Sequence, residues 1–142
     1  MFWDQDRELL PLIELKKRQL EKLNRTLARA SHAPYYRERF AERAGRPLSS
    51  LEEIVTLPFT TKDDLRNHFP YGFLAVPEEE VVRLHSSSGT TGNPTVVYHS
   101  QKDIADWADL MARCLFMTGA RKSDVFQNMM GYGLFTGGLG LH

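Results

Sequence analysis

The sequence predicts an α/β protein that is helical in its first half and gains strands only in its second half. Three observations support this prediction. Apolar residues recur at helical spacing near the N-terminus, β-branched residues cluster in two later runs, and a second helical pattern follows those runs. The apolar fraction of 42% and the charged fraction of 25% are typical of a globular chain. We therefore divide the 142 residues into a helical region, 1–77, and an α/β region, 78–142.

The longest predicted helix runs from about Leu10 to Ser31. Pro11 suits its first turn, because the N–H that proline lacks would have no helical partner there. The apolar stripe of this helix consists of Ile13, Leu20, Leu23, Leu27 and Ala30. A basic amphipathic helix is compatible with a membrane surface, but leucine and alanine alone form a weak anchor. We therefore favour a helix that packs on its own domain.

Shorter helices are expected between this helix and residue 77. Pro34 opens the first of them, and Gly45 marks its end. Capping boxes, in which a hydroxyl is followed three residues later by a carboxylate, predict the start of two more: Ser50 with Glu53, and Thr61 with Asp64. The run Glu78, Glu79 and Glu80 predicts a solvated acidic turn where the strands begin.

The α/β region begins with two short strands, 81–85 and 95–99, which are rich in β-branched residues. A helix over 101–118 follows, because its apolar residues form one stripe: Ile104, Trp107, Ala108, Met111 and Leu115. Cys114 lies next to this stripe, and we interpret it as a small core residue rather than a nucleophile. Residues 125–130 predict a third strand.

Charge and cysteine content exclude several classes of protein. Lys and Arg number 18, as do Asp and Glu, so the formal net charge of zero argues against a nucleic-acid partner. The single cysteine excludes an internal disulfide and a cysteine-based zinc site, and it favours a cytoplasmic location. No apolar run reaches the roughly 18 residues of a membrane span, and no secretion signal is present. The histidines lack metal-ligand spacing: His32, His68, His85, His99 and His142.

A loop rich in hydroxyl groups and glycine joins the two predicted strands. Five hydroxyls lie between Ser86 and Thr91, and Gly89 and Gly92 allow a ligand to approach the main chain closely. Consecutive backbone N–H groups in such a loop can bind an anion. It is not a Walker A loop, which ends in Gly-Lys-Ser/Thr. Composition alone leaves two interpretations open, an ordinary hairpin connection and a phosphate-binding loop.

Two histidines flank this loop, one on each predicted strand. His85 closes the first strand and His99 closes the second. One interpretation brings a ring toward a ligand bound in the loop. We favour the other, in which a strand-end histidine meets a backbone carbonyl.

The order of residues in the loop resembles the phosphate-binding signature of the adenylate-forming superfamily: Ser87-Ser88-Gly89-Thr90-Thr91-Gly92-x-Pro94. Three further segments, 34–37, 57–66 and 132–140, resemble the phenylacetate–coenzyme A ligases within that superfamily. The resemblance covers nearly the whole chain, in order. It implies that residues 78–142 begin the large N-terminal domain of such an enzyme, and that the chain is its N-terminal portion only.

The resemblance also implies an activity, that of an AMP-forming acid–thiol ligase. Such ligases join a carboxylate, here phenylacetate, to ATP with release of pyrophosphate, and then transfer the acyl group from the adenylate to coenzyme A. ATP with Mg²⁺ and coenzyme A are thus substrates, and no tightly bound cofactor or metal ligand is expected. The β- and γ-phosphates are assigned to Ser87, Ser88, Gly89, Thr90, Thr91 and Gly92. The pocket for the aromatic acid is assigned to Tyr132, Phe135, Gly137 and Gly138, with plain core packing as the alternative for the two aromatic residues.

Two departures from the family pattern limit these expectations. The loop has Asn93 and Thr95 where lysines are usual in the family or superfamily. The catalytic lysine of the family would lie beyond His142, so no catalytic residue is assigned here and we expect this chain alone to be inactive. The end of the chain, 131–142, predicts a glycine-rich, apolar loop without cover, and hence self-association.

Two other functions remain compatible with the sequence. The first is another ligase of the superfamily that activates a different aryl or acyl acid. The second is a non-catalytic chain, from a split gene or a degenerate remnant, that binds a partner chain such as the missing C-terminal portion. A further possibility is that two copies of the chain form a homodimer.

Overall fold

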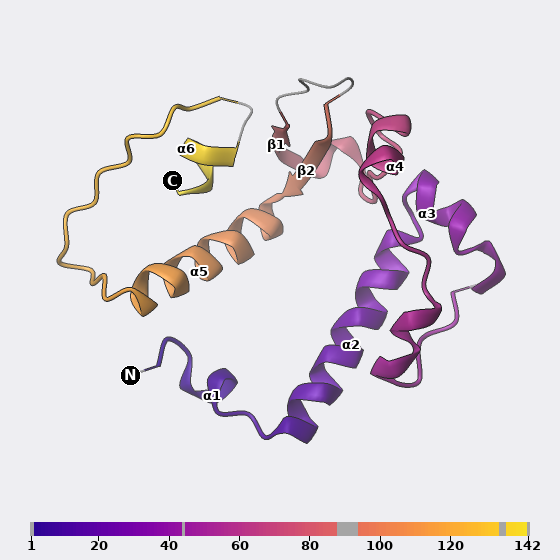
Figure 1. Ribbon diagram of the computed structural model, residues 1–142, viewed down its shortest axis with the longest axis horizontal. Helices are drawn as coiled ribbons and strands as arrows, with labels where there is room; N and C mark the ends of the chain where they lie inside the picture. The colour runs from indigo at the N-terminus through magenta and orange to yellow at the C-terminus, as the bar shows by residue number, and fades with distance from the viewer. Residues whose placement is uncertain (1, 44, 88–93, 134–135, 142) are drawn as a thin grey trace. The chain divides into compact units, whose positions relative to one another are not determined.

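The computed structural model describes residues 2–43, 45–87, 94–133 and 136–141 (Figure 1). These residues form two compact units. The first, which we call the helical unit, comprises residues 6–77. The second comprises residues 1–5 together with 78–142, and we call it the hairpin unit. No helix in the described ranges is both long enough and apolar enough to cross a bilayer.

The helical unit is built on the long helix α2, Leu12–Ala30, which follows the short helix α1, Gln5–Glu8 (Figure 1). Its bounds agree with the predicted helix. Its apolar stripe is covered only in part, since Ile13 is 82% exposed whereas Leu27 is half-buried. The Asn24 amide donates to the Leu48 carbonyl at 2.9 Å and accepts from the Leu48 N–H at 2.7 Å. These two bonds fasten the segment after residue 45 to α2.

Shorter helices follow α2: α3, Pro34–Arg39; a 3₁₀ helix, Ala41–Arg43; a second 3₁₀ helix, Leu51–Thr56; and α4, Lys62–Asn67. The capping box at the start of α4 is confirmed, because Asp64 N–H donates to Thr61 Oγ1 at 3.2 Å and Thr61 N–H donates to Asp64 Oδ2 at 2.8 Å. The box expected from Ser50 is wrong. The Ser50 side chain makes no capping bond, and the Glu53 carboxylate instead accepts from Ser49, whose N–H lies 3.4 Å away.

The core of the helical unit is an aromatic cluster around Tyr35, whose side chain is buried. The Tyr35 ring lies 4.4 Å from the Phe73 ring and 4.8 Å from the His68 ring, between centroids. Its N–H donates to the Gly72 carbonyl at 2.9 Å. A Cβ atom on Gly72 would lie 2.4 Å from the Cβ of His68, so only glycine permits this close return of the chain.

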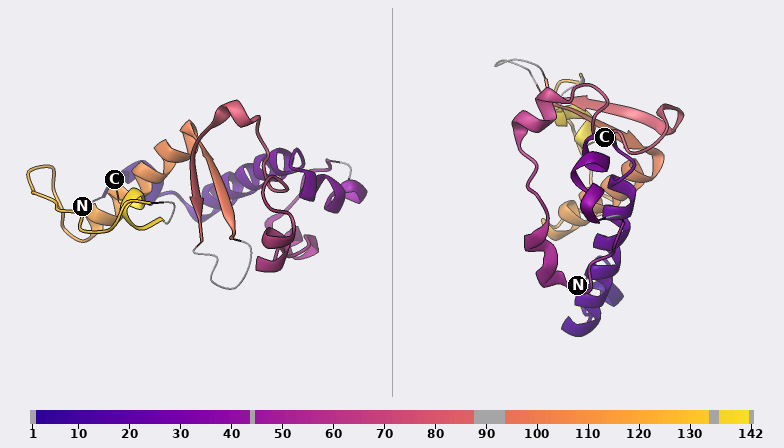
Figure 2. Two further views of the ribbon diagram at one scale, coloured as in Figure 1. Left: turned by 90° about the horizontal axis from the view of Figure 1, so that it is seen from above. Right: turned by 90° about the vertical axis from the view of Figure 1, so that its right-hand side faces the viewer.

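The hairpin unit contains a two-stranded antiparallel sheet of β1, Val81–Ser86, and β2, Val96–Ser100. A 3₁₀ helix, Glu78–Glu80, precedes β1, and the helix α5, Gln101–Met117, follows β2 directly (Figure 2). Ser100 caps α5 in a reciprocal box with Asp103, whose N–H donates to Ser100 Oγ at 3.3 Å. The predicted strands and helix are therefore confirmed to within about one residue.

Three predictions for this unit are wrong. Residues 125–130 form no strand, because among the described residues no second strand runs beside them to supply hydrogen bonds, and Val125 is 99% exposed. Cys114 is exposed, because α5 has too little packed against it to bury any of its residues. Ala108 is exposed for the same reason, whereas Trp107 is half-buried.

The first residues of the chain dock on α5. The indole N–H of Trp3 donates to Asp109 Oδ1 at 3.0 Å, and the Trp3 ring lies 5.6 Å from the Phe116 ring. The Arg121 guanidinium covers the same Phe116 ring at 4.5 Å. Residues separated by about a hundred positions in sequence thus belong to one unit.

Candidate functional site

The predicted phosphate-binding loop is carried by the β1–β2 hairpin, whose last ladder pair is Ser86 with Val96. Beyond this pair, Ser87 N–H donates to the Thr95 carbonyl at 2.9 Å, and Thr95 N–H donates to Ser87 Oγ at 3.0 Å. The two ends of the loop are therefore tied together at residues 87 and 95. Ser87 uses its oxygen as an acceptor in this bond, so its hydroxyl hydrogen stays available as a donor.

The remaining residues assigned to phosphate lie outside the described ranges: Ser88, Gly89, Thr90, Thr91 and Gly92. Asn93, which departs from the family pattern, also lies outside them. Of the predicted phosphate residues, the structure describes Ser87 alone and places it at the base of the loop.

Three aromatic rings pack against one another beside the hairpin. His85, His99 and Trp107 lie with each pair of ring centroids 5.2 Å apart. His85 is only 4% exposed, and neither of its ring nitrogens has a hydrogen-bond partner among the described residues. The expected contact of this ring with a backbone carbonyl is therefore wrong. The His85 ring instead packs against His99 and Trp107, and only Ser86 separates His85 from the loop base at Ser87.

Electrostatics keep the two histidine rings of this cluster neutral. Burial, assisted by the nearby Arg83 charge, lowers the pKa of His85. Burial also lowers the pKa of His99, as do His85 and Arg83, while the Asp103 carboxylate acts in the opposite direction. A neutral ring can pack against Trp107 without a buried charge that lacks a counter-ion.

These lowered pKa values predict a loss of stability at acid pH. The unfolded chain binds protons at higher pH than the folded hairpin unit does, so stability is full above the ordinary histidine pKa of about 6.5. It falls as the pH drops below that value toward the folded pKa. We expect the urea midpoint, followed by tryptophan fluorescence, to decrease between pH 7.5 and pH 5. His85→Phe keeps a ring but cannot titrate, so it should flatten this decrease; equal decreases in both proteins would contradict the assignment.

Two of the predicted acid-pocket residues, Tyr132 and Gly138, bond to the side chain of Asn128. Its amide nitrogen donates to the Gly138 carbonyl at 3.0 Å and to the Tyr132 hydroxyl at 3.3 Å. The amide oxygen accepts from the Met130 N–H at 3.0 Å. Asn128, whose amide links Tyr132 to Gly138, was not predicted from the sequence. The signal was an amide just before a glycine-rich segment, because asparagine side chains often bond the backbone two residues on.

The structure brings Tyr132 and Gly138 together through this amide, although Tyr132 itself is 58% exposed. A Cβ atom on Gly138 would lie 2.7 Å from the Gly131 carbonyl oxygen, so the close approach of these segments requires glycine there. Gly137 is half-buried beside it, and Phe135 lies outside the described residues.

The segment that bears these glycines is a short helix, α6, Thr136–Gly140, rather than wholly a loop as predicted. The Arg83 guanidinium donates to the Leu139 carbonyl at 3.2 Å and thereby satisfies one C-terminal oxygen of this turn. Gly140 lies against Trp107, since a Cβ atom there would be 3.2 Å from the indole ring. Trp107 therefore contacts both His85, which precedes the loop, and Gly140, which lies in α6.

The described part of the site thus comprises a closed loop base at Ser87 and Thr95, and a glycine-rich turn held by the Asn128 amide. Within the described ranges, no three His, Cys, Asp or Glu side chains gather as a metal site.

Sequence comparison finds curated relatives that share a single name. The chain is 51% identical to the phenylacetate–coenzyme A ligase of Pseudomonas putida, a match that covers all of this chain and 34% of the relative. It is 46% identical to the ligase of that name from Thermus thermophilus, over all of this chain and 33% of the relative. The Escherichia coli ligase is 46% identical over 91% of this chain and 30% of the relative. No family model matches the chain.

The chain therefore spans about a third of the length of the curated relatives it matches. Comparison of structures finds 2-hydroxyisobutyryl-CoA ligase in the postadenylation state, in complex with 2-HIB-AMP. Its TM-score is 0.86 at 30% identity, and the match covers 99% of this chain and 31% of the other. The same ligase in complex with 2-HIB-AMP and CoA, in its thioester-forming state, gives a TM-score of 0.82 at 31% identity, over 93% of this chain and 30% of the other.

Proposed function

We propose, from the premise that this chain matches the N-terminal portion of phenylacetate–coenzyme A ligases, that it supplies the phosphate loop and part of the acid pocket of such an enzyme. The whole protein then converts phenylacetate, ATP and coenzyme A into phenylacetyl-CoA, AMP and pyrophosphate. It acts in the cytoplasm, in keeping with the free cysteine of this chain.

The observation that carries this proposal is the closed hairpin base at Ser87 and Thr95. It holds both ends of a loop whose composition offers hydroxyl and backbone N–H donors. Hydroxyl and backbone N–H donors of this kind stabilise the negative charge of the β- and γ-phosphates. Mg²⁺ accompanies the nucleotide and neutralises further phosphate charge.

The loop acts on the leaving group of the first step. A carboxylate oxygen of phenylacetate attacks the α-phosphorus, and the bond from that phosphorus to the bridging oxygen breaks. Pyrophosphate leaves with the electron pair, held by Ser87 and the rest of the loop. In the second step the coenzyme A sulfur attacks the acyl carbon, and AMP leaves with the electrons of the acyl–oxygen bond.

The acid pocket is formed in part by the turn that Asn128 holds. Gly138 lets the turn approach the Gly131 carbonyl closely, and Gly137 beside it leaves room for a flat ring next to Tyr132, which shares the Asn128 amide with Gly138. Phe135, which lies outside the described residues, is assigned to the same pocket by the resemblance alone, and aromatic neighbours contact a substrate ring edge-to-face. The structural match to 2-hydroxyisobutyryl-CoA ligase favours, as a second candidate, a ligase for another small carboxylic acid.

The proposal is tested by nucleotide binding to the 142-residue chain, measured by calorimetry with MgATP. We expect binding that inorganic pyrophosphate displaces, and no net turnover by this chain alone. Ser87→Ala and Thr90→Val each remove a donor to a charged group, so each should weaken binding about tenfold.

Ser49→Ala, which removes an exposed hydroxyl from the helical unit, is the matched control and should leave the affinity unchanged. Absence of MgATP binding, or equal effects of all three substitutions, would refute the phosphate loop. The choice of acid is tested separately in the full-length protein, by phenylacetate-dependent ATP–pyrophosphate exchange compared with 2-hydroxyisobutyrate.

A further inference from the structure

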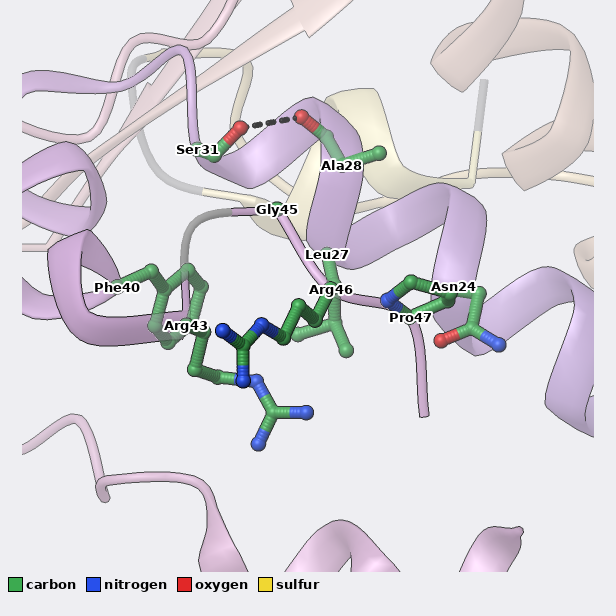
Figure 3. Close-up of a pocket in the computed structure, with 9 residues that line it drawn as sticks. All are labelled: Asn24, Leu27, Ala28, Ser31, Phe40, Arg43, Gly45, Arg46 and Pro47. Atoms are coloured by element: carbon green, nitrogen blue, oxygen red, sulfur yellow. Dashed lines mark hydrogen bonds between the residues drawn. The ribbon is translucent and has the colours of Figure 1, made fainter. Parts of the chain in front are cut away.

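The helical unit contains a cavity of about 230 Å³ that belongs to no part of the site described above (Figure 3). It lies between α2 and the segment around residues 40–47, and its lining consists of Asn24, Leu27, Ala28, Ser31, Phe40, Arg43, Gly45, Arg46 and Pro47. It is large enough for one small ring with a polar substituent.

The charge at this cavity is positive and unbalanced. Two of the lining residues are arginines, and none is acidic. Arg43 donates one Nη1–H to the Thr56 hydroxyl at 3.0 Å, and the Arg46 side chain has no hydrogen-bond or ion-pair partner among the residues that the structure describes. Figure 3 shows the two side chains pointing toward one another across the view. Two guanidinium groups that share a cavity repel each other, and an oxyanion between them removes this repulsion.

The remaining polar groups of the lining are already engaged. Both ends of the Asn24 amide are bonded to Leu48, and the Ser31 hydroxyl donates to the Ala28 carbonyl at 2.7 Å. The rest of the wall is apolar, formed by Leu27, Phe40 and Pro47 together with alanine. The cavity therefore offers two cationic donors and an apolar wall, which is the pattern of a site for an amphipathic anion.

We propose that this cavity binds a small organic oxyanion, with its carboxylate or phosphate head on Arg43 and Arg46 and a single-ring body against Leu27, Phe40 and Pro47. Arginine suits this role because its planar fork donates two parallel hydrogen bonds to either kind of head. The site lies wholly within residues 24–47, so the inference does not depend on the proposed ligase function.

The test is ligand binding to the 142-residue chain, with phenyl phosphate, benzoate, inorganic phosphate and benzyl alcohol as probes. We expect at least one of the two aromatic anions to bind, and which one binds identifies the preferred head. Inorganic phosphate lacks the apolar body and benzyl alcohol lacks the charge, so each should bind at least fivefold more weakly. Amide chemical shifts of Leu27 and Ala28 should move on titration.

Arg46→Gln should weaken the binding of the aromatic anion at least fivefold. Arg25→Gln, which makes the same change of charge on an exposed face of α2, should alter it less than twofold. Tyr132→Ala should leave it unchanged, since that residue belongs to the predicted acid pocket. The proposal is overturned if neither aromatic anion binds, if both arginine variants weaken binding equally, or if the alcohol binds as well as the anions.

Discussion

Replacement of Trp107 by alanine is expected to destabilise the hairpin unit by about 3 kcal/mol. The indole ring contacts His85 and His99 with centroid distances of 5.2 Å, and Gly140 lies against its other side. Its removal leaves a void beneath β1 and β2 and withdraws the support of α6. Since the unit has few fully buried side chains in its described part, little other packing replaces this contact.

The effect is measured by urea unfolding, followed by the fluorescence of Trp3, and by amide hydrogen exchange in 81–86 and 101–117. Trp107→Phe is the matched control, because it keeps an aromatic ring and should cost less than half as much free energy. A Trp107→Ala protein with unchanged exchange in both segments would show that the ring cluster does not hold the hairpin.

Replacement of Tyr35 by alanine is expected to destabilise the helical unit by about 4 kcal/mol. Tyr35 is 4% exposed, and its ring packs on the rings of Phe73 and His68, while the Arg39 guanidinium lies 5.1 Å from its centroid. Tyr35 lies in α3, so removal of its ring abolishes the contacts between α3 and the chain that follows α4.

Amide exchange in 34–39 and 62–74 measures this effect. Tyr35→Phe retains every ring contact and removes only the hydroxyl, so its cost should stay below about 1 kcal/mol. The pKa of Tyr35 is raised by burial and by the Asp64 carboxylate, which keeps the hydroxyl neutral well above physiological pH. Equal losses of stability in the alanine and phenylalanine variants would show that the hydroxyl, and not the ring, stabilises the unit.

The elements that could be predicted from the sequence are those with a complete local signal. The helix α2 has its periodic stripe, α4 has its Thr61–Asp64 cap, and β1 and β2 have their β-branched runs. Each signal lies within the element or next to it. The phosphate loop could likewise be located, because its residue order is itself the signal.

The features that could not be predicted depend on partners distant in sequence. Residues 125–130 have strand-like composition, but a strand also requires a neighbour to bond with. The short helix α6 depends on Arg83, more than fifty residues earlier, for one of its end bonds. The role of Asn128 depends on the return of Gly138 to its amide, which no periodic pattern records. The capping box expected at Ser50 does not form, because the neighbouring Ser49 donates to the same Glu53 carboxylate.

The docking of Trp3 on Asp109 and Phe116 has a consequence for how the chain matures on the ribosome. Trp3 must wait for α5, about a hundred codons later, before it reaches its final contacts. A purification tag fused ahead of Trp3 would consequently perturb the hairpin unit, although the helical unit is its nearer neighbour along the chain. A tag placed elsewhere on the polypeptide leaves the contacts of Trp3 with α5 undisturbed.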